Sequence, residues 1–266
     1  MPRTRCIALA ISWKGAFPVT TNDPVVASRS PADESGDERL LLALDKGVRD
    51  DRELAGQICR ACVASMNIDG AAISLLTSTA ARITLFATDP TAELLEDLQF
   101  TLGEGACMQA AATAQPVLVA DMIDPTQNAH WPVYATAVVD QAHVRAVFAL
   151  PLQWGPTNLG VLDLYRRSPG PLTRTELRSA VRAADTAAAM LLLGQHTDPS
   201  DNHAWDRSWG NRVEIHQAIA MVGIQLHLGP DDSLARLRAH SFTENRLLPD
   251  VAADVVTRRM RFNPDS

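Results

Sequence analysis

The chain has 266 residues, 46% of them hydrophobic, which is enough for one generous globular domain and a smaller second one. Its net charge of −7 excludes a protein coated in positive charge for non-specific nucleic-acid binding, although a local basic face is still compatible with it. Four cysteines do not make a disulfide framework at this length, and no apolar run approaches the ~18 residues that cross a bilayer, so we predict a cytoplasmic protein without a membrane partner.

Prolines and polar turn formers dominate residues 1–36. Too little apolar surface is available there to offset the entropy lost on ordering the chain. We therefore expect these residues to form a disordered extension.

A mixed α/β pattern occupies residues 37–195. An opening helix is predicted from Glu38 to about Asn67, where apolar residues recur on one side. Asp69-Gly70 then turns the chain into two strand-like runs, AAISLLTS and RITLFATD, which are close enough in sequence to form a hairpin. A short helix is expected around Ala92–Leu98.

The second half of this region begins with LGEGACMQAAATAQPVLVAD, which predicts a glycine turn, a helix of small residues and a short strand ending at Asp121. The stretch HWPVYATAVVDQA suits another helix. Two strong runs, VRAVFALPLQW and NLGVLDLYR, are predicted to form a central hairpin. A final helix follows, with Thr173 as its cap and Glu176 at the reciprocal capping-box position.

This order of elements, and above all LGEGACMQAAATAQPVLVAD and the hairpin VRAVFALPLQWGPTNLGVLDLYRRSPGPLT, resembles a GAF domain. The resemblance implies an α+β fold: a GAF-like antiparallel sheet with flanking helices and a pocket for a small-molecule signal. It indicates no particular cofactor.

By the same resemblance, the pocket is expected between the central sheet and the stretch from Phe100 to Val144. The predicted walls from the sheet are Ile73, Leu75, Phe86, Phe148 and Leu150. The predicted ligand contacts are polar or aromatic side chains of that stretch, namely Glu104, Cys107, Asp121, Trp131 and Tyr134, with His130 and His143 as further candidates. Each of these side chains also has an ordinary structural use as a turn, cap or core residue.

Cys59 and Cys62 have CxxC spacing, but no histidine pair or second CxxC completes a zinc site. We interpret them as two small buried core residues. Cys107 follows Gly103-Glu104-Gly105 at a predicted helix N-terminus, a place that favours thiolate. Some GAF-fold enzymes reduce free methionine sulfoxide through cysteines in this part of the fold, so a redox enzyme stays a minor alternative to a protein that is not an enzyme.

Residues 196–210 form a polar linker that contains Trp205 and Trp209, and residues 211–262 predict three short helices. The first, from Val213 to Leu228, ends at Gly229-Pro230. The second is expected to begin at Asp231 or Asp232 and to carry Leu234, Leu237, Ser241 and Phe242 inward. The third opens at Pro249-Asp250, carries Val251, Ala252, Val255, Val256 and Met260 as its apolar stripe, and crowds Arg258, Arg259 and Arg261 into its last turn.

The matching blocks Gln217-Ala218 and Met221-Val222, Leu234 to His240, Asp250-Val251-Ala252 and Val255-Val256 resemble an ANTAR domain, the three-helix RNA-binding module of bacterial antiterminators. Two features bear on RNA affinity: Ala220 stands where glycine is usual in the family, and positive and negative charges from His203 to Ser266 are equal in number. The candidate RNA-binding residues are polar or cationic side chains of the three helices and of the turn before the third, namely His216, Gln217, Gln225, Arg236, Arg238, His240, Arg246 and Arg258.

A GAF–ANTAR arrangement implies a sensor that regulates transcription antitermination by binding RNA stem-loops in nascent transcripts, as a homodimer, under a small-molecule or protein signal. We expect dimerisation or release of the C-terminal unit to be the switch, with Trp205 and Trp209 packing against the sensor in one state. Two alternatives are a DNA-binding regulator, and a ligand-binding or redox module whose C-terminal helices only dimerise.

Overall fold

A computed structural model describes residues 51–76, 82–194 and 210–263 of the chain. The predicted extension over 1–36, the first part of the opening helix, and Trp205 and Trp209 lie outside these residues. The helices and strands follow in the order α2 (Asp51–Ser65), β1 (Gly70–Leu76), β2 (Arg82–Ala87), α3 (Pro90–Leu102), α4 (Ala106–Thr113), β3 (Val117–Val119), α5 (Pro125–Asn128), α6 (Pro132–Ala137), the π-helical turn η1 (Val138–Ala142), β4 (Ala146–Trp154), β5 (Thr157–Arg166), α7 (Arg174–Gly194), α9 (Gly210–Leu226), α10 (Pro230–Thr243) and α11 (Leu248–Val256).

The strands form one antiparallel sheet in the order β2-β1-β5-β4-β3. Both predicted hairpins are present, and the turn between β4 and β5 is tight, with Gly155 in the left-handed region. At the centre of the sheet β5 passes so close to β1 that a Cβ on Gly160 would lie 2.2 Å from the carbonyl oxygen of Ser74. The predicted α+β class with an antiparallel sheet and flanking helices is confirmed.

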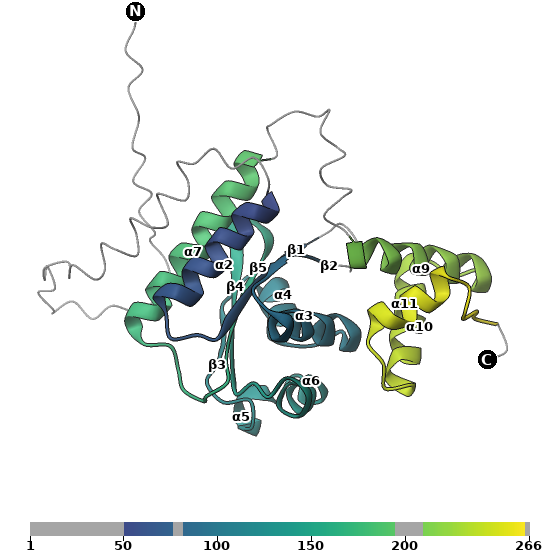
Figure 1. Cartoon of the computed structure of the whole chain (residues 1–266), viewed down its shortest axis with the longest axis horizontal. Coiled ribbons are helices and arrows are strands. Elements are labelled where there is room, and N and C mark those ends of the chain that lie inside the picture. Colours follow the sequence, from purple (N-terminus) through teal and green to yellow (C-terminus); the bar gives the residue numbers. More distant parts are fainter. Residues whose placement is uncertain (1–50, 77–81, 195–209, 264–266) are drawn as a thin grey trace, which may run out of the picture.

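Helices cover both faces of the sheet (Figure 1). On one face α2 and α7 lie side by side and bury strand residues that include Ile73, Leu75, Phe148 and Leu150. On the other face α3, α4, α6 and η1 pack over the strand residues Ala72, Val147, Ala149, Val161 and Tyr165. Successive side chains of a strand point to opposite faces, so these two sets alternate along the same strands.

This alternation corrects the predicted pocket walls. Ile73, Leu75, Phe148 and Leu150 face α2 and α7, and Phe86 packs against the same cluster. The sheet face that packs against α3, α4, α6 and η1 carries mostly smaller side chains, such as Ala72 and Ala149. The predicted pocket walls therefore lie on the wrong face of the sheet.

Helix α3 is longer at both ends than the predicted Ala92–Leu98 because it has strong start and stop signals. Asp89 caps its N-terminus by accepting hydrogen bonds from the backbone N–H groups of Thr91 and Ala92, and Pro90 occupies the first turn. Gly103 ends the helix in the left-handed conformation, and its N–H donates to the carbonyl of Gln99. The helix therefore continues past Leu98 to Leu102.

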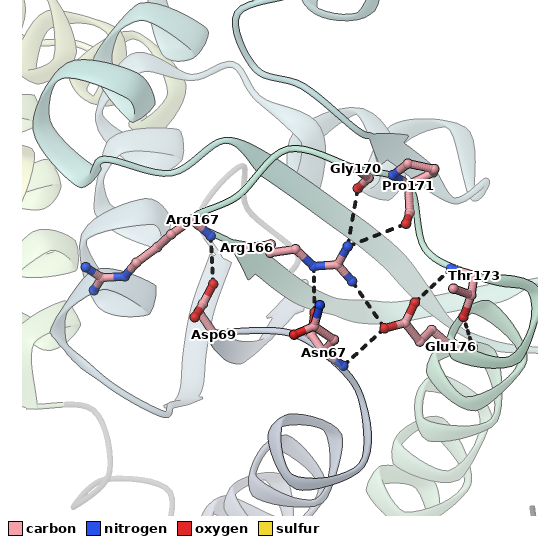
Figure 2. Close-up of polar contacts among 8 residues, drawn as sticks. All are labelled: Asn67, Asp69, Arg166, Arg167, Gly170, Pro171, Thr173 and Glu176. Carbon is pink, nitrogen blue, oxygen red and sulfur yellow. Dashed lines mark hydrogen bonds and ion pairs between the residues drawn. The ribbon is translucent and has the colours of Figure 1, made fainter.

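A buried arginine ties the start of α7 to the loop before β1 (Figure 2). Arg166 is only 6% exposed; its Nε donates to the carbonyl of Asn67 at 2.5 Å, and its Nη2 lies 3.3 Å from Oε1 of Glu176. Glu176 also accepts from the backbone N–H of Thr173 at 2.7 Å, and Thr173 Oγ1 accepts from the N–H of Glu176 at 3.2 Å. The predicted capping box is confirmed, and Arg166 adds a charge to it that the pattern did not predict.

The C-terminal helices α9, α10 and α11 pack around their own core of Ile215, Ala218, Val222, Leu234, Leu237, Leu248, Val251, Ala252, Val255 and Phe262, and they lie beside α3 (Figure 1). The three helices lie where the breaks in the pattern predicted them.

Three details of these helices differ from the prediction. Helix α10 begins at Pro230 with Gly229 as its N-cap, so Asp231 and Asp232, predicted to begin the helix, lie inside its first turn. Phe242 is 64% exposed because Ser233, Leu234, Leu237 and Ser241 set the buried face and Phe242 falls one position past it. Helix α11 ends at Val256, so Arg258 follows the helix, with a positive φ of 60°, instead of lying in its last turn.

Among the described helices, none combines the length and the apolar character needed to cross a membrane.

Candidate functional site

A small cavity lies between α3, α4, α6 and the sheet face opposite α2 and α7. Its lining combines apolar side chains with polar ones from α3, α6 and β5: Ala72, Ala92, Leu95, Glu96, Gln99, Ala106, Tyr134, Val147, Asp163, Leu164 and Tyr165. The space between the lining atoms is about 280 Å³ with its open mouth included, and the room that is clear of side chains is that of about one water molecule. A larger ligand can enter only if part of this lining moves.

Glu96 of α3 lies at the centre of the polar side of the cavity and is 2% exposed. One carboxylate oxygen accepts hydrogen bonds from the hydroxyl of Ser74 in β1 and, at 3.4 Å, from that of Thr84 in β2, while the other accepts from Nε2 of Gln99 at 3.4 Å. The Oε1 of Gln99 then accepts from the backbone N–H of Cys107 at 2.7 Å. Because buried polar groups are costly unless they are hydrogen-bonded, this chain fixes α3 against the sheet and against the start of α4.

Three potential cation ligands meet at this point. One donor atom each of Glu96, Cys107 and Asp163 lies within 4.8 Å of the other two. Two carboxylates and a thiol could hold a small cation or a hydrogen-bond donor of a ligand. The hydrogen bonds from Ser74 and Gln99 already stabilise Glu96, so the fold does not require an ion for that carboxylate.

Tyr165 closes the edge of the cavity. Its hydroxyl donates to Oδ1 of Asp89, the N-cap of α3, at 2.8 Å. Burial, followed by the hydrogen bond to Asp89, raises the pKa of the Tyr165 phenol. The side chain is therefore neutral and acts as a donor, and it links the sheet to the first turn of α3.

Of the five predicted ligand contacts, only Tyr134 lines the cavity and only Cys107 adjoins its polar side. Glu104 accepts from the backbone N–H of Tyr134 at 2.9 Å and so stabilises the start of α6. Trp131 donates through its indole N–H to Oε1 of Gln109 at 2.8 Å and packs edge-on against Tyr134. Both hold the cavity wall in place without facing the cavity.

Asp121 lies elsewhere, in a two-pronged ion pair with Arg145 in which oxygen–nitrogen distances are 2.9 to 3.1 Å. It also accepts from the backbone N–H of Ile123 and so stabilises the turn after β3. His130 and His143 are exposed. The structure does not bring these three side chains to the cavity.

The three cysteines among the described residues, Cys59, Cys62 and Cys107, are buried. Cys59 and Cys62 are 0% and 2% exposed in the core under α2, as predicted. Burial raises the pKa of Cys62 to about 12 and that of Cys59 well above its usual value, with the neighbouring Cys62 adding to the shift at Cys59. Such thiols are poor nucleophiles, because the thiolate is the reactive form.

The polar cavity residues that were not predicted are Glu96, Gln99, Asp163 and Tyr165, and Ser74, which hydrogen-bonds Glu96, was not predicted either. A signal for two of them was present: Ala92, Leu95, Glu96 and Gln99 share one side of a helix, so a charged and an amide side chain occupy an apolar stripe. Asp163 likewise interrupts the apolar run LGVLDLY. Polar residues inside an apolar pattern are the ones most often kept for a site or a buried network.

The candidate RNA-binding residues fall into two groups. Gln217, Arg236 and Arg258 are exposed. Most of the others have contacts within the fold. Gln225 accepts a hydrogen bond from the backbone N–H of Phe262 at 2.9 Å, and Arg246 forms an ion pair with Asp254 at 2.7 Å. His216 is half-buried. The ring of His240 lies edge-on to Phe262 with centroids 5.3 Å apart, and its buried Nε2 has no hydrogen-bond partner among the described residues.

Arg238 lies against the sensor side of the molecule. Its Nε donates to the carbonyl of Phe100 at 2.9 Å, and its guanidinium carbon lies 5.2 Å from the centroid of the Phe100 ring. Arg236, two residues away, lies about 200° round the helix, on the opposite flank of α10. The two arginines therefore lie on opposite flanks of α10, and Arg238 contacts α3.

A family model described as the GAF domain matches residues 50–191. No curated protein sequence matches the chain. Among solved structures, the GAF domain of an Acinetobacter phosphoenolpyruvate-protein phosphotransferase is 12% identical with a TM-score of 0.51, and the match covers 64% of this chain and 98% of that one.

Two further solved structures are similar to a lesser degree. A free methionine-R-sulfoxide reductase from Neisseria meningitidis in complex with its substrate is 15% identical with a TM-score of 0.48, covering 64% of this chain and 96% of that one. A domain of a two-component sensor histidine kinase protein from Sinorhizobium meliloti 1021 is 16% identical with a TM-score of 0.45, covering 54% and 92%. The Acinetobacter GAF domain, at 12% identity and a TM-score of 0.51, shows a shared fold and no activity.

Proposed function

Because the chain belongs to the GAF domain family, whose members are signal-sensing modules, we propose that it is a signal-responsive RNA-binding regulator of transcription antitermination. In this proposal the cavity beside α3 receives the signal and the helices α9, α10 and α11 bind RNA. The pattern of these helices, which is similar to that of ANTAR domains, is the basis for choosing RNA.

The observation that supports RNA binding best is the placement of arginines on α10. Arg236 is exposed on one flank of the helix, and Arg238 lies on the other. Guanidinium groups contact phosphates in a bidentate manner and stack on unpaired bases, which suits the loop of an RNA hairpin. Gln217 of α9 is an exposed hydrogen-bonding group on the neighbouring helix.

The cavity supports a sensor role through its chemistry. It is enclosed mainly by apolar side chains, with the polar groups of Glu96, Gln99 and Asp163 converging on one side, as in many small-molecule sites. The carboxylates favour a ligand that carries a positive charge or hydrogen-bond donors.

Two alternatives belong to other classes of function. A DNA-binding regulator would use the same three helices, and a ligand-binding or redox module would use them only to dimerise. The burial of Cys59, Cys62 and Cys107 argues against a redox enzyme in this conformation, because each thiol is shielded from a substrate. A homodimer is compatible with each of these functions.

The test is a binding comparison between a pool of two-hairpin RNAs with randomised loops and duplex DNA of the same length, at several salt concentrations. We expect selective RNA binding that weakens about tenfold in Arg236→Ala, with a smaller salt dependence because one phosphate contact is lost. Arg178→Ala, which removes an exposed arginine from α7, is the matched control and should leave the Kd unchanged. Equal weak binding to both nucleic acids, unaffected by Arg236→Ala, would favour the dimerisation module.

A further inference from the structure

The last turn of α3 makes a specific contact with the C-terminal helices. The Phe100 carbonyl accepts from Nε of Arg238, and the Phe100 ring lies under the same guanidinium. One residue later, the hydroxyl oxygen of Thr101 accepts the backbone N–H of Leu248 at the start of α11, at 3.0 Å. Phe100 is 1% exposed and belongs to the core of the C-terminal helices. The contact thus combines a cation–π pair, a partly buried hydrogen bond from Arg238, a buried hydrogen bond from the Leu248 N–H and a shared aromatic anchor.

This contact uses the groups of Arg238 that RNA would need. An arginine binds RNA through its N–H donors and by stacking its planar guanidinium on a base. In the docked arrangement Nε is committed to the Phe100 carbonyl, and the guanidinium is held over the Phe100 ring. Gly103 approaches so closely that a Cβ there would lie 3.2 Å from Nη1 of Arg238, so no base fits between them. Docking on α3 and RNA binding by this flank of α10 exclude each other.

We infer that the end of α3 is an intramolecular competitor of RNA: the docked state withholds Arg238, and RNA is bound fully once α10 and α11 leave α3. This inference rests on the proposed function and names its regulation. Arg236, on the opposite flank, is exposed in the docked state and supplies a first, weaker contact with RNA.

The same helix connects the competitor to the cavity. Glu96 and Gln99 line the cavity, and Phe100 and Thr101 are the next residues of α3. Because the cavity has room for about one water molecule, a larger ligand must displace part of its lining. A shift of α3 away from the sheet carries Phe100 and Thr101 with it, since a helical turn moves as a unit, and so changes the docking surface that Arg238 and Leu248 contact. Ligand binding and RNA binding are coupled if both favour the released state.

The test changes only the sensor side of the contact, so that no candidate RNA-binding residue is altered. Thr101→Val keeps the shape of the side chain and removes the acceptor for the Leu248 N–H. Phe100→Leu keeps an apolar anchor and removes the ring under Arg238. The matched control is Thr113→Val on α4, an exposed threonine whose hydroxyl donates only within its own helix. Far-UV circular dichroism confirms that each full-length variant is folded.

Two quantities are measured: hydrogen exchange at the Leu248 amide, which reports docking, and the Kd for the two-hairpin RNA pool. We expect both sensor-side variants to exchange faster at Leu248 and to bind RNA about tenfold more tightly, because the binding-competent fraction rises when docking is weakened. Thr113→Val should match the wild-type chain in both.

The outcomes separate the inference from the proposed function. Faster exchange at Leu248 with an unchanged or weaker RNA Kd overturns the competitor alone and leaves RNA binding in place. Unchanged exchange in both variants overturns it as well, since the contact would not hold the two parts together. Absence of RNA binding by the wild-type chain and by every variant overturns the proposed function and the inference with it.

Discussion

Replacing Arg166 by methionine removes the charge that joins three segments of the sensor while keeping most of the side-chain volume. The arginine holds the Asn67 carbonyl and the Glu176 carboxylate, and its Nη1 lies 3.5 Å from the carbonyls of Gly170 and Pro171 (Figure 2). Breaking one side of a buried ion pair costs about 3–5 kcal/mol. Glu176 retains hydrogen bonds from the backbone N–H groups of Thr173 and Asn67, so we expect the low end of this range, about 3 kcal/mol.

For a chain of this size 1 kcal/mol shifts Tm by about 2–4 °C, so Arg166→Met should lower Tm by about 6–12 °C. The measurement is thermal unfolding of the full-length chain followed by far-UV circular dichroism, with urea unfolding to obtain the free energy. Arg167→Met is the matched control, because this neighbouring arginine is exposed and the substitution retains the hydrogen bond from its backbone N–H to Asp69. Removing the Arg167 side chain should change the free energy of unfolding by less than about 0.5 kcal/mol. If Arg166→Met melts within 2 °C of the control, on the scale of about 2–4 °C for each kcal/mol, the buried pair does not stabilise the start of α7.

Three more outcomes are expected. Burial raises the pKa of Glu176, but the hydrogen bonds from Thr173 and Asn67 and the charge of Arg166 together outweigh burial, so the pKa lies below its usual 4.5. The contribution of Glu176 to the stability of the folded chain is therefore fully present above pH 4.5 and is lost as the pH falls through the lowered pKa. The Tm difference between wild type and Glu176→Gln should accordingly narrow below pH 4.5, and a constant difference from pH 7 to pH 3 would contradict this assignment. Cys59 and Cys62, whose pKa values burial raises, should resist iodoacetamide at pH 8 in the folded chain and react after denaturant is added, as peptide mapping by mass spectrometry can show; rapid labelling of the folded chain would be inconsistent with their burial. Gly160→Ala should destabilise the sheet by about 2–3 kcal/mol in urea unfolding, because its Cβ would collide with the carbonyl oxygen of Ser74; wild-type stability would mean that the strands can separate there at little cost.

Local patterns were sufficient for most of the elements and for one cap. The capping box at Thr173 and Glu176, the two hairpins and the breaks between the C-terminal helices all depend on residues within a few positions of one another. Such signals are written into short stretches of sequence, so they can be interpreted without knowing the rest of the fold.

The cavity depends on a choice that the pattern does not contain. Both faces of the central strands are apolar and buried, so alternation separates two sets of residues but does not say which set faces the cavity. The small side chains Ala72 and Ala149 mark the cavity face, and the bulkier Ile73 and Phe148 mark the other. Glu96 was missed for a related reason: a glutamate on a helix normally faces water, and its burial is stabilised by Ser74, 22 positions earlier in the chain.

Arg238 could be proposed as an RNA contact from its helix, but its present partner could not. The Phe100 carbonyl that it contacts is 138 positions away, and nothing in the pattern of either helix specifies that the two meet. The same holds for the hydrogen bond between Leu248 and Thr101, which are 147 positions apart.

Helix α3 contributes to two hydrophobic cores at once. Leu95 and Leu98 are buried in the sensor, while Phe100, in the same helix, is buried with Val251 and Leu237. Any separation of the C-terminal helices from α3, by a signal or by division of the chain, therefore uncovers the part of their core that Phe100 covers in the docked state. A fusion of these helices to another protein would need an aromatic side chain in the place of Phe100. The structural unit formed by the C-terminal helices therefore includes the end of α3 and does not begin at the linker.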